Sequence, residues 1–137
     1  MSPDLAPSDP PLVEIAAAVI ERDGRYLIAR RQDQAVLGGY WEFPGGKRAA
    51  GETVEDCLRR EVLEETGLRI TSARLIQRTG YRYPHAAVDI HFYHCAVAAG
   101  DPRPSGAEIR WVSPDRLGDF RFPPANADLL RLLAAGI

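Results

Sequence analysis

The sequence predicts one α+β domain in which two helices accompany a mixed β-sheet. Its 137 residues suit a single domain with its own core. Hydrophobic residues make up 45% and charged residues 26% of the chain, which is ordinary for a folded globular protein. Segments typical of strands outnumber the two helical segments and do not alternate with them regularly, which favours a mixed sheet.

The chain begins with a segment that does not look folded. Residues 1–11 hold four prolines among Asp, Ser and Ala, so we predict a flexible arm there and a single domain over residues 12–137. Leu12–Glu21 is apolar and β-branched enough for a buried strand. The dipeptide Asp23-Gly24 predicts a hairpin turn, after which Arg25–Arg31 returns as a second strand.

The middle of the chain contains a glycine-rich loop and a helix. Residues 32–51 hold five of the twelve glycines, which predicts a loop. Residues 53–66 contain neither Gly nor Pro, and Gly67 stands where a helix C-cap is expected. The sequence therefore predicts a helix over residues 53–66.

The rest of the chain is predicted to return to the sheet and close with a helix. Residues 74–83 and 88–97 are strand candidates on either side of a turn at Pro84, and residues 108–112 form a short third candidate. Residues 126–135 carry four leucines and predict the closing helix.

Composition excludes several classes of function. A net charge of −2 argues against a basic surface that binds a nucleic-acid polymer. The apolar runs are far shorter than the roughly 20 residues of a membrane helix, and the first twelve residues have no basic group and do not resemble a signal peptide. The two cysteines, Cys57 and Cys95, form no metal-type pair. We therefore expect a reduced, cytoplasmic protein that is not bound to a membrane.

The predicted helix carries three carboxylates on one face. With about 100° per residue, Glu65 lies about 40° and Glu64 about 60° around the helix from Glu61. Carboxylates at this spacing repel one another. A divalent cation would relieve that repulsion, and oxygen ligands suit Mg²⁺, with Mn²⁺ as the alternative. A solvated acidic face is the alternative interpretation of the same pattern.

The preceding loop favours the metal and phosphate interpretation. Closely spaced glycines such as Gly45-Gly46 let backbone N–H groups approach a phosphate, and a following helix N-terminus adds positive potential. Lys47 supplies a point charge beside them. A simple tight turn is the alternative for the glycine pair alone.

Residues 46–68, GKRAAGETVEDCLRREVLEETGL, resemble the 23-residue signature of the Nudix hydrolases at every defined position. The constrained positions and their spacing are Gly46, Glu52, Arg60, Glu61, Val62, Glu64, Glu65, Gly67 and Leu68. The resemblance implies the Nudix fold, an α/β/α sandwich around a mixed β-sheet. It also implies metal-assisted hydrolysis of a nucleoside diphosphate linked to another group.

The signature implies roles for individual residues. It assigns metal binding to Gly46, Glu52, Glu61, Glu64 and Glu65. Glu64 also becomes a catalytic candidate that aligns or deprotonates water. The catalytic candidate Arg60 would orient the glutamates through charge-assisted hydrogen bonds, and Gly46 and Lys47 would meet the phosphates of the substrate.

The resemblance extends beyond the signature to the MutT-like branch of the family. It rests on Arg30-Arg31, on the run Trp41-Glu42-Phe43-Pro44-Gly45-Gly46-Lys47, on Tyr81-Arg82-Tyr83-Pro84, and on Phe122-Pro123-Pro124-Ala125-Asn126. The matching base pocket would consist of Arg31, Phe43, Tyr83 and Asn126. Simpler interpretations are a helix N-cap for Asn126, core packing for the two aromatic residues, and a solvated strand end for Arg31.

Two positions depart from the branch. Ala86 stands where MutT-like proteins have an arginine, and Ser105 stands where relatives commonly place a further catalytic glutamate. Glu108 is the nearest carboxylate and is the candidate replacement, with an ordinary place at a strand edge as the alternative.

The resemblance therefore predicts an Mg²⁺-dependent pyrophosphohydrolase acting on a small-molecule nucleotide. The leading substrate is a nucleoside triphosphate of the 8-oxo-dGTP type, cleaved to monophosphate and pyrophosphate in sanitisation of the nucleotide pool. Alternatives are a Nudix hydrolase of CTP, dCTP or ADP-ribose, and a catalytically silent nucleotide-binding module.

Overall fold

The computed structural model describes residues 11–32, 37–103 and 106–136. All but the last residue of the predicted N-terminal arm, residues 1–11, lies outside these ranges. In chain order the elements are β1 (Leu12–Arg22), β2 (Arg25–Arg30), β3 (Trp41–Glu42), β4 (Gly45–Lys47), α1 (Val54–Thr66), β5 (Ile70–Arg82), β6 (Ala87–Val97), β7 (Ile109–Val112), the 3₁₀ turns Pro114–Asp119 and Pro124–Asn126, and α2 (Ala127–Ala134).

The strands form the mixed sheet that the sequence predicts, in the order β3-β2-β1-β6-β5. The long strand β1 organises it, because it pairs in parallel with β6 from Leu12↔Ala87 to Ile20↔Cys95 and antiparallel with β2 at its C-terminal end. β4 adds to the edge of β1, and β7 pairs with β2.

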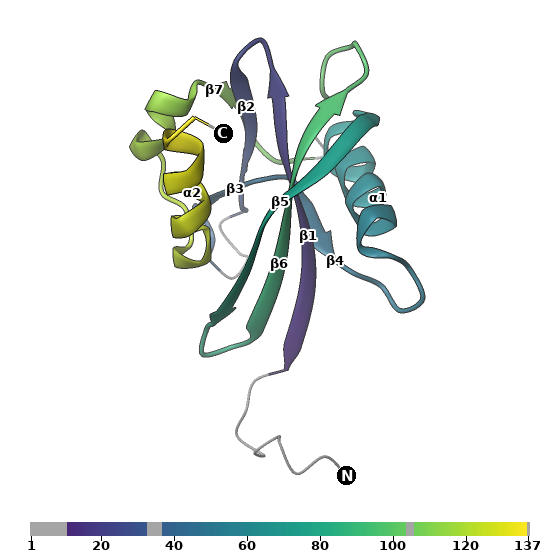
Figure 1. The fold of residues 1–137 in the computed structure, drawn as a ribbon, viewed down its shortest axis with the longest axis vertical. Coiled ribbons are helices and arrows are strands. Elements are labelled where there is room, and N and C mark those ends of the chain that lie inside the picture. The colour runs from purple at the N-terminus through teal and green to yellow at the C-terminus, as the bar shows by residue number, and fades with distance from the viewer. Residues whose placement is uncertain (1–10, 33–36, 104–105, 137) are drawn as a thin grey trace.

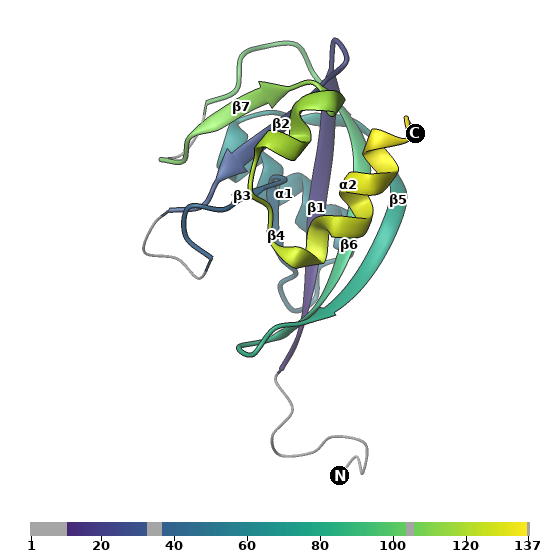
Figure 2. The same cartoon turned by 90° about the vertical axis from the view of Figure 1, so that its left-hand side faces the viewer.

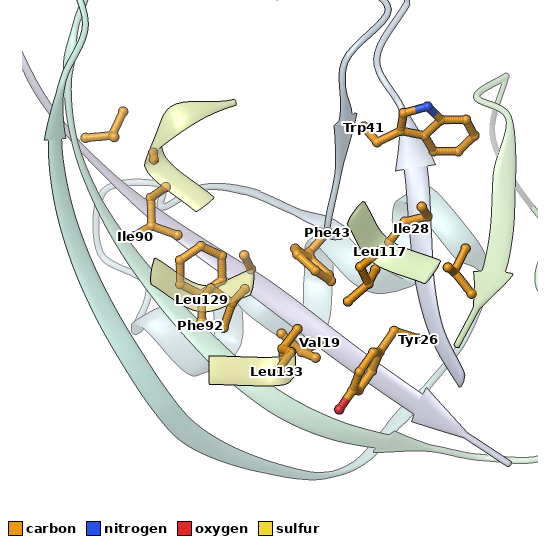
Figure 3. Close-up of a cluster of buried hydrophobic side chains, with 14 residues drawn as sticks. Val19, Tyr26, Ile28, Trp41, Phe43, Ile90, Phe92, Leu117, Leu129 and Leu133 are labelled. Carbon is orange, nitrogen blue, oxygen red and sulfur yellow. The ribbon is translucent and has the colours of Figure 1, made fainter. Parts of the chain in front are cut away.

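The two helices lie on opposite sides of the strands, so the molecule has three layers (Figures 1 and 2). One apolar core joins the sheet to α2 through Leu129 and Leu133. Figure 3 shows this cluster, with Phe43 near its middle. The second core lies under α1, where Cys57, Leu58 and Val62 are fully buried. The α/β/α expectation is thus confirmed.

The predicted helix is confirmed, with both of its ends stabilised as the sequence indicates. Thr53 is the N-cap, and its hydroxyl accepts a hydrogen bond from the Asp56 N–H at 3.1 Å. Gly67 ends the helix with φ of 73°, in the left-handed region that glycine adopts without strain.

The predicted loop at residues 32–51 is wrong in part, because it contains β3 and β4. Each is too short to show an alternating pattern, and both are held by pairing with longer strands. β5 also begins four residues before the predicted start at Arg74. Its register with β6 shifts twice, between Ile70 and Ser72 and between Leu75 and Gln77, which interrupts the alternation that identifies a strand.

No helix in the described residues is long and apolar enough to cross a membrane.

Candidate active site

Helix α1 brings the predicted carboxylates to the edge of the sheet. The side chain of Glu61 is 18% exposed and that of Glu64 is 57% exposed, while Glu65 is half-buried one residue further along. One carboxylate of this face is therefore exposed and two are partly buried, as expected for an acidic patch at the border of a core.

Arg60 contacts three carboxylates of this region. Its guanidinium donates to both oxygens of Glu52, at 2.7 and 3.1 Å. It also donates to Glu61 at 2.9 Å and reaches Glu64 at 3.4 Å. A planar guanidinium suits such simultaneous contacts, so Arg60 fixes the spacing of the acidic side chains.

The same contacts set the protonation state of Glu52. The Arg60 hydrogen bonds, followed by one from the Ala49 N–H at 2.8 Å, lower the Glu52 pKa to about 2. The Glu52 and Glu61 carboxylates in turn raise the pKa of Arg60 above its usual value. This ion pair therefore stays charged across the neutral range.

Glu65 has the opposite electrostatic environment. Burial, followed by the neighbouring carboxylates of Glu42, Glu61 and Glu64, raises its pKa to about 8. The Gly45 N–H, which donates to Glu65 Oε2 at 3.1 Å, opposes this shift. Crowded carboxylates of this kind are what a bound cation stabilises.

The glycine pair at residues 45–46 allows close packing. A Cβ at Gly45 would lie 2.0 Å from the Ala16 carbonyl oxygen, and a Cβ at Gly46 would lie 2.4 Å from the Glu61 carboxyl carbon. Because the Gly45 N–H already donates to Glu65, the structure gives this glycine a different use from the phosphate contact that the sequence suggests.

The donor set fits a hard divalent cation, although the side chains do not form a complete cage. Among the described residues, no three carboxylates, imidazoles or thiolates are gathered around one point. Glu61 and Glu64 instead contact Arg60. However, the missing side chain at Gly46 leaves room for the Glu61 carboxylate against the backbone, and Glu65 belongs to a crowded acidic group. Oxygen ligands of this kind suit Mg²⁺ or Mn²⁺.

A cavity of about 510 Å³ connects Glu61 and Glu65, but not Glu64, to an apolar interior. Its acidic end includes Glu61 and Glu65 together with Gly46 and Lys47. The remaining wall is mainly apolar and comes from β1, β6 and the segments before β4 and α2, with Val13, Ile15, Ala17, Val88, Ile90, Phe92, Phe43, Pro123 and Ala125 among its residues.

All four residues of the predicted base pocket line this cavity. Phe43 also belongs to the core, where its ring stacks on Phe122 at 5.3 Å. The Tyr83 hydroxyl accepts a hydrogen bond from the Ala125 N–H at 3.1 Å. Arg31 forms an ion pair with Glu42 at 2.8 Å. For Phe43, packing in the core and a place in the cavity wall are therefore compatible.

The alternative interpretation of Asn126 as the N-cap of α2 is confirmed for its position only. Asn126 occupies the N-cap position of α2, but its side chain makes no capping hydrogen bond. Its amide nitrogen donates to the Pro123 carbonyl at 3.4 Å. The residue is 7% exposed, so the structure places a buried amide in the cavity wall.

A second cavity of about 290 Å³ adjoins the first. Arg31, Glu42 and Glu65 line both cavities. Glu108 lines neither of them, and its carboxylate pairs with Arg110 at 2.8 Å. In this structure the candidate replacement for the further glutamate is thus at a strand edge, while Ser105 lies outside the described residues.

From the sequence, His85 after the turn at Pro84 is interpreted as a surface loop histidine rather than a substrate contact, and Glu42 is given no role. Both are polar residues of the cavity wall. Burial raises the pKa of the Glu42 carboxyl, and the ion pair with Arg31 opposes that effect. Because β3 holds only two residues, no alternating pattern in the sequence identifies this position. The ring of His85 stacks on Tyr83, a contact that the sequence does not reveal.

Comparison with known proteins identifies relatives along most of the chain. The NUDIX domain family matches residues 15–132. An 8-oxo-dGTP diphosphatase from Haemophilus influenzae is 35% identical over 127 residues, covering 91% of this chain and 93% of the relative. A CTP pyrophosphohydrolase from Escherichia coli is 30% identical over 125 residues, covering 90% and 93%.

Solved structures agree with these sequence relatives. A MutT structure from work on Aliivibrio salmonicida and Vibrio cholerae superposes with a TM-score of 0.77 at 28% identity. It covers 91% of this chain and 98% of the solved one. The family match over residues 15–132 spans the acidic helix and most of the segments that line the cavity.

Proposed function

Because the chain belongs to the Nudix hydrolase family and to its MutT-like branch, we propose that it is an Mg²⁺-dependent nucleoside triphosphate pyrophosphohydrolase. The leading substrate class is a purine nucleoside triphosphate with an oxidised base, as in 8-oxo-dGTP. The observation that carries this proposal is the cavity of about 510 Å³, which has an apolar, aromatic end and an acidic end. A nucleotide has the same two halves.

The apolar end suits a nucleobase. Phe43 and Tyr83 offer aromatic surface, and base–aromatic contacts are favourable for any base. The buried Asn126 amide offers one acceptor and two donors, which suffices to distinguish base edges. Only one of its donors has a protein partner at hydrogen-bond distance among the described residues, and that contact is long.

The acidic end suits the phosphate chain once its charge is balanced. Lys47 and Arg31 contribute positive charge to the cavity wall. Glu61, Glu64 and Glu65 would hold the cation, and the Gly46 backbone would stand beside them. When bound, Mg²⁺ neutralises phosphate charge and makes a water more acidic. Arg60 keeps the carboxylates in place through the contacts at 2.7 to 3.4 Å.

Glu64 is our candidate for the group that aligns the water and accepts its proton. It is the most exposed of the three helix carboxylates of the face, so solvent reaches it without rearrangement. In the reaction the water oxygen bonds to a phosphorus atom, the bridging P–O bond breaks, and monophosphate and pyrophosphate leave. Arg60 is a positioning residue in this scheme.

A pyrimidine triphosphate is the second candidate substrate. Its support is the E. coli CTP pyrophosphohydrolase, which covers 90% of this chain at 30% identity, together with small Ala86 in the cavity wall. The substrate in either case is a free nucleotide. Two buried free thiols, Cys57 and Cys95, are compatible with a reducing compartment, and we propose the cytoplasm.

The deciding experiment is product analysis with Mg²⁺ and a panel of 8-oxo-dGTP, the ordinary dNTPs and NTPs, and ADP-ribose. Preference for 8-oxo-dGTP with release of pyrophosphate supports the leading proposal. Preference for CTP or dCTP supports the second candidate and retains the acidic site. Nucleotide binding without turnover of any compound favours a silent binding module and contradicts the proposal.

A variant tests the base pocket separately from the chemistry. We expect Asn126→Ala to change the ranking among bases more than the rate on the best substrate, because the amide faces the cavity and does not cap α2. An equal loss with every nucleotide would instead make Asn126 a general structural support.

A further inference from the structure

The turn between β5 and β6 is a fixed part of the cavity wall. It spans Tyr83 to Ala86 and is closed by a hydrogen bond from the Tyr83 N–H to the Ala86 carbonyl at 2.8 Å. Three of its residues, Tyr83, His85 and Ala86, line the cavity of about 510 Å³. The backbone of the turn therefore determines where the His85 side chain stands.

The His85 ring is supported by its neighbour. Its plane lies 18° from that of Tyr83, with the ring centres 5.2 Å apart. Tyr83 is itself anchored, because its hydroxyl accepts the hydrogen bond from the Ala125 N–H, next to Asn126. Stacking occupies one face of the imidazole and leaves the ring edge, which carries both nitrogens, available for contact.

Few uncharged polar groups can read a base in this cavity. Of its described lining side chains, only Tyr83, His85 and Asn126 are polar without a fixed charge. The charged ones already have partners or belong to the acidic end: Arg31 pairs with Glu42, and Lys47 stands near the carboxylates. The His85 side chain makes no hydrogen bond to any described residue, although its ring lies at the cavity.

We propose that His85 is a specificity-determining residue whose imidazole nitrogens hydrogen-bond to the base of the bound nucleotide. The inference rests on the proposed nucleotide substrate and extends it by naming a third base-reading side chain, beside Asn126 and Tyr83. His85 is an exposed residue, so its preference comes from the hydrogen bond gained with a matching base. His85 therefore affects the choice among bases and has no part in bond cleavage.

Two substitutions separate stacking from hydrogen bonding. His85→Phe keeps an aromatic ring against Tyr83 but removes both nitrogens, and His85→Ala removes both features. We expect each variant to reduce the kcat/KM ratio between the best and the worst nucleotide about tenfold, mainly through KM. His94→Ala is the matched control, because His94 pairs with Glu21 at 2.7 Å on β6 and lines neither cavity.

Binding measurements keep the test independent of turnover. Calorimetry with nucleoside monophosphates, compared with ribose 5-phosphate, isolates the contribution of the base. We expect both His85 variants to narrow the spread of monophosphate affinities about tenfold and to leave the affinity for ribose 5-phosphate unchanged. Wild-type ranking in His85→Phe would overturn the proposal. So would a parallel loss that includes ribose 5-phosphate, which indicates a structural role.

The same data distinguish failure of the two proposals. If wild-type protein hydrolyses no triphosphate but the His85 variants still change the ranking of the monophosphates, the proposed function fails and the role of His85 stands. If the wild type hydrolyses a triphosphate and the variants leave the ranking intact, the proposed function stands and the role of His85 fails.

Discussion

Gly45 and Gly46 are adjacent in β4, yet a methyl group added at each would meet a different neighbour. At Gly45 the obstacle is the backbone of β1, and at Gly46 it is the movable carboxylate of Glu61. A side-chain end can rotate away, whereas a paired strand cannot. Substitution by alanine should therefore affect the fold at one position and the acidic site at the other.

We expect Gly46→Ala to displace Glu61 and weaken Mg²⁺ activation of the enzyme, with a small change in stability. Gly45→Ala should cost about 1–3 kcal/mol of unfolding free energy, the usual effect of overpacking. Mg²⁺ titrations of activity and urea denaturation measure the two effects. Equal Mg²⁺ dependence in Gly46→Ala and wild type would contradict the contact between Gly46 and Glu61.

Among the described residues, Glu64 makes only a long contact with Arg60, so its charge can be removed without disturbing packing. We expect Glu64→Gln to lower kcat about 10²–10⁴-fold, the usual contribution of a positioned acid–base group. The melting temperature should stay close to that of wild type. Glu55→Gln, an exposed change in the first turn of the same helix, is the matched control. A wild-type rate in Glu64→Gln would remove this residue from the mechanism.

At the scale of elements, helix α1 was the easiest to predict because its signals are local. Thr53 and Gly67 mark its ends, and the spacing of its carboxylates follows from the helical repeat. β3 and β4 could not be predicted in the same way. They exist because the long strands β1 and β2 offer partners, and a single short stretch of sequence does not contain that information.

The residues of the candidate site also fall into two groups, those that a local motif reveals and those that only the tertiary structure brings together. The helical spacing alone identifies carboxylates such as Glu61, and the role of Arg60 comes from the resemblance of residues 46–68 to the Nudix signature. Glu42 and His85 enter the cavity through tertiary structure, one by strand pairing and the other by stacking in a turn. Glu108 has the right residue type near the expected place, and in this structure its carboxylate pairs with Arg110 and lines neither cavity.

The N-cap of α1 gives a prediction at this scale. Removing the Thr53 hydroxyl leaves the Asp56 N–H without its acceptor, and Thr53→Ala should cost about 1 kcal/mol of stability. Because the carboxylates proposed to bind metal are held separately by Arg60 and Gly45, kcat at 25 °C should not change. Chemical denaturation and initial rates check both parts. A matching loss of kcat would show that the first turn also positions the carboxylates.

For the whole molecule, stability depends on pH through Glu65, whose pKa is raised from 4.5 to about 8 in the folded protein. Below pH 4.5 its carboxyl is protonated in both folded and unfolded chains. Between 4.5 and 8 the unfolded chain releases the proton while the folded one retains it, so the free energy of unfolding falls as pH rises. Glu52, with its pKa lowered to about 2, has the opposite effect. Its contribution to the free energy of unfolding is lost only as pH falls below 4.5.

In the presence of a chelator, we therefore expect the melting temperature of wild type to fall relative to that of Glu65→Gln as pH rises from about 5 to about 8. Because a metal ligand must be ionised, the increase in melting temperature caused by Mg²⁺ should be larger at about pH 8 than at about pH 5. Calorimetry at constant ionic strength measures both. A constant difference between wild type and Glu65→Gln would contradict the raised pKa, and an equal Mg²⁺ effect in the variant would remove Glu65 from the metal ligands.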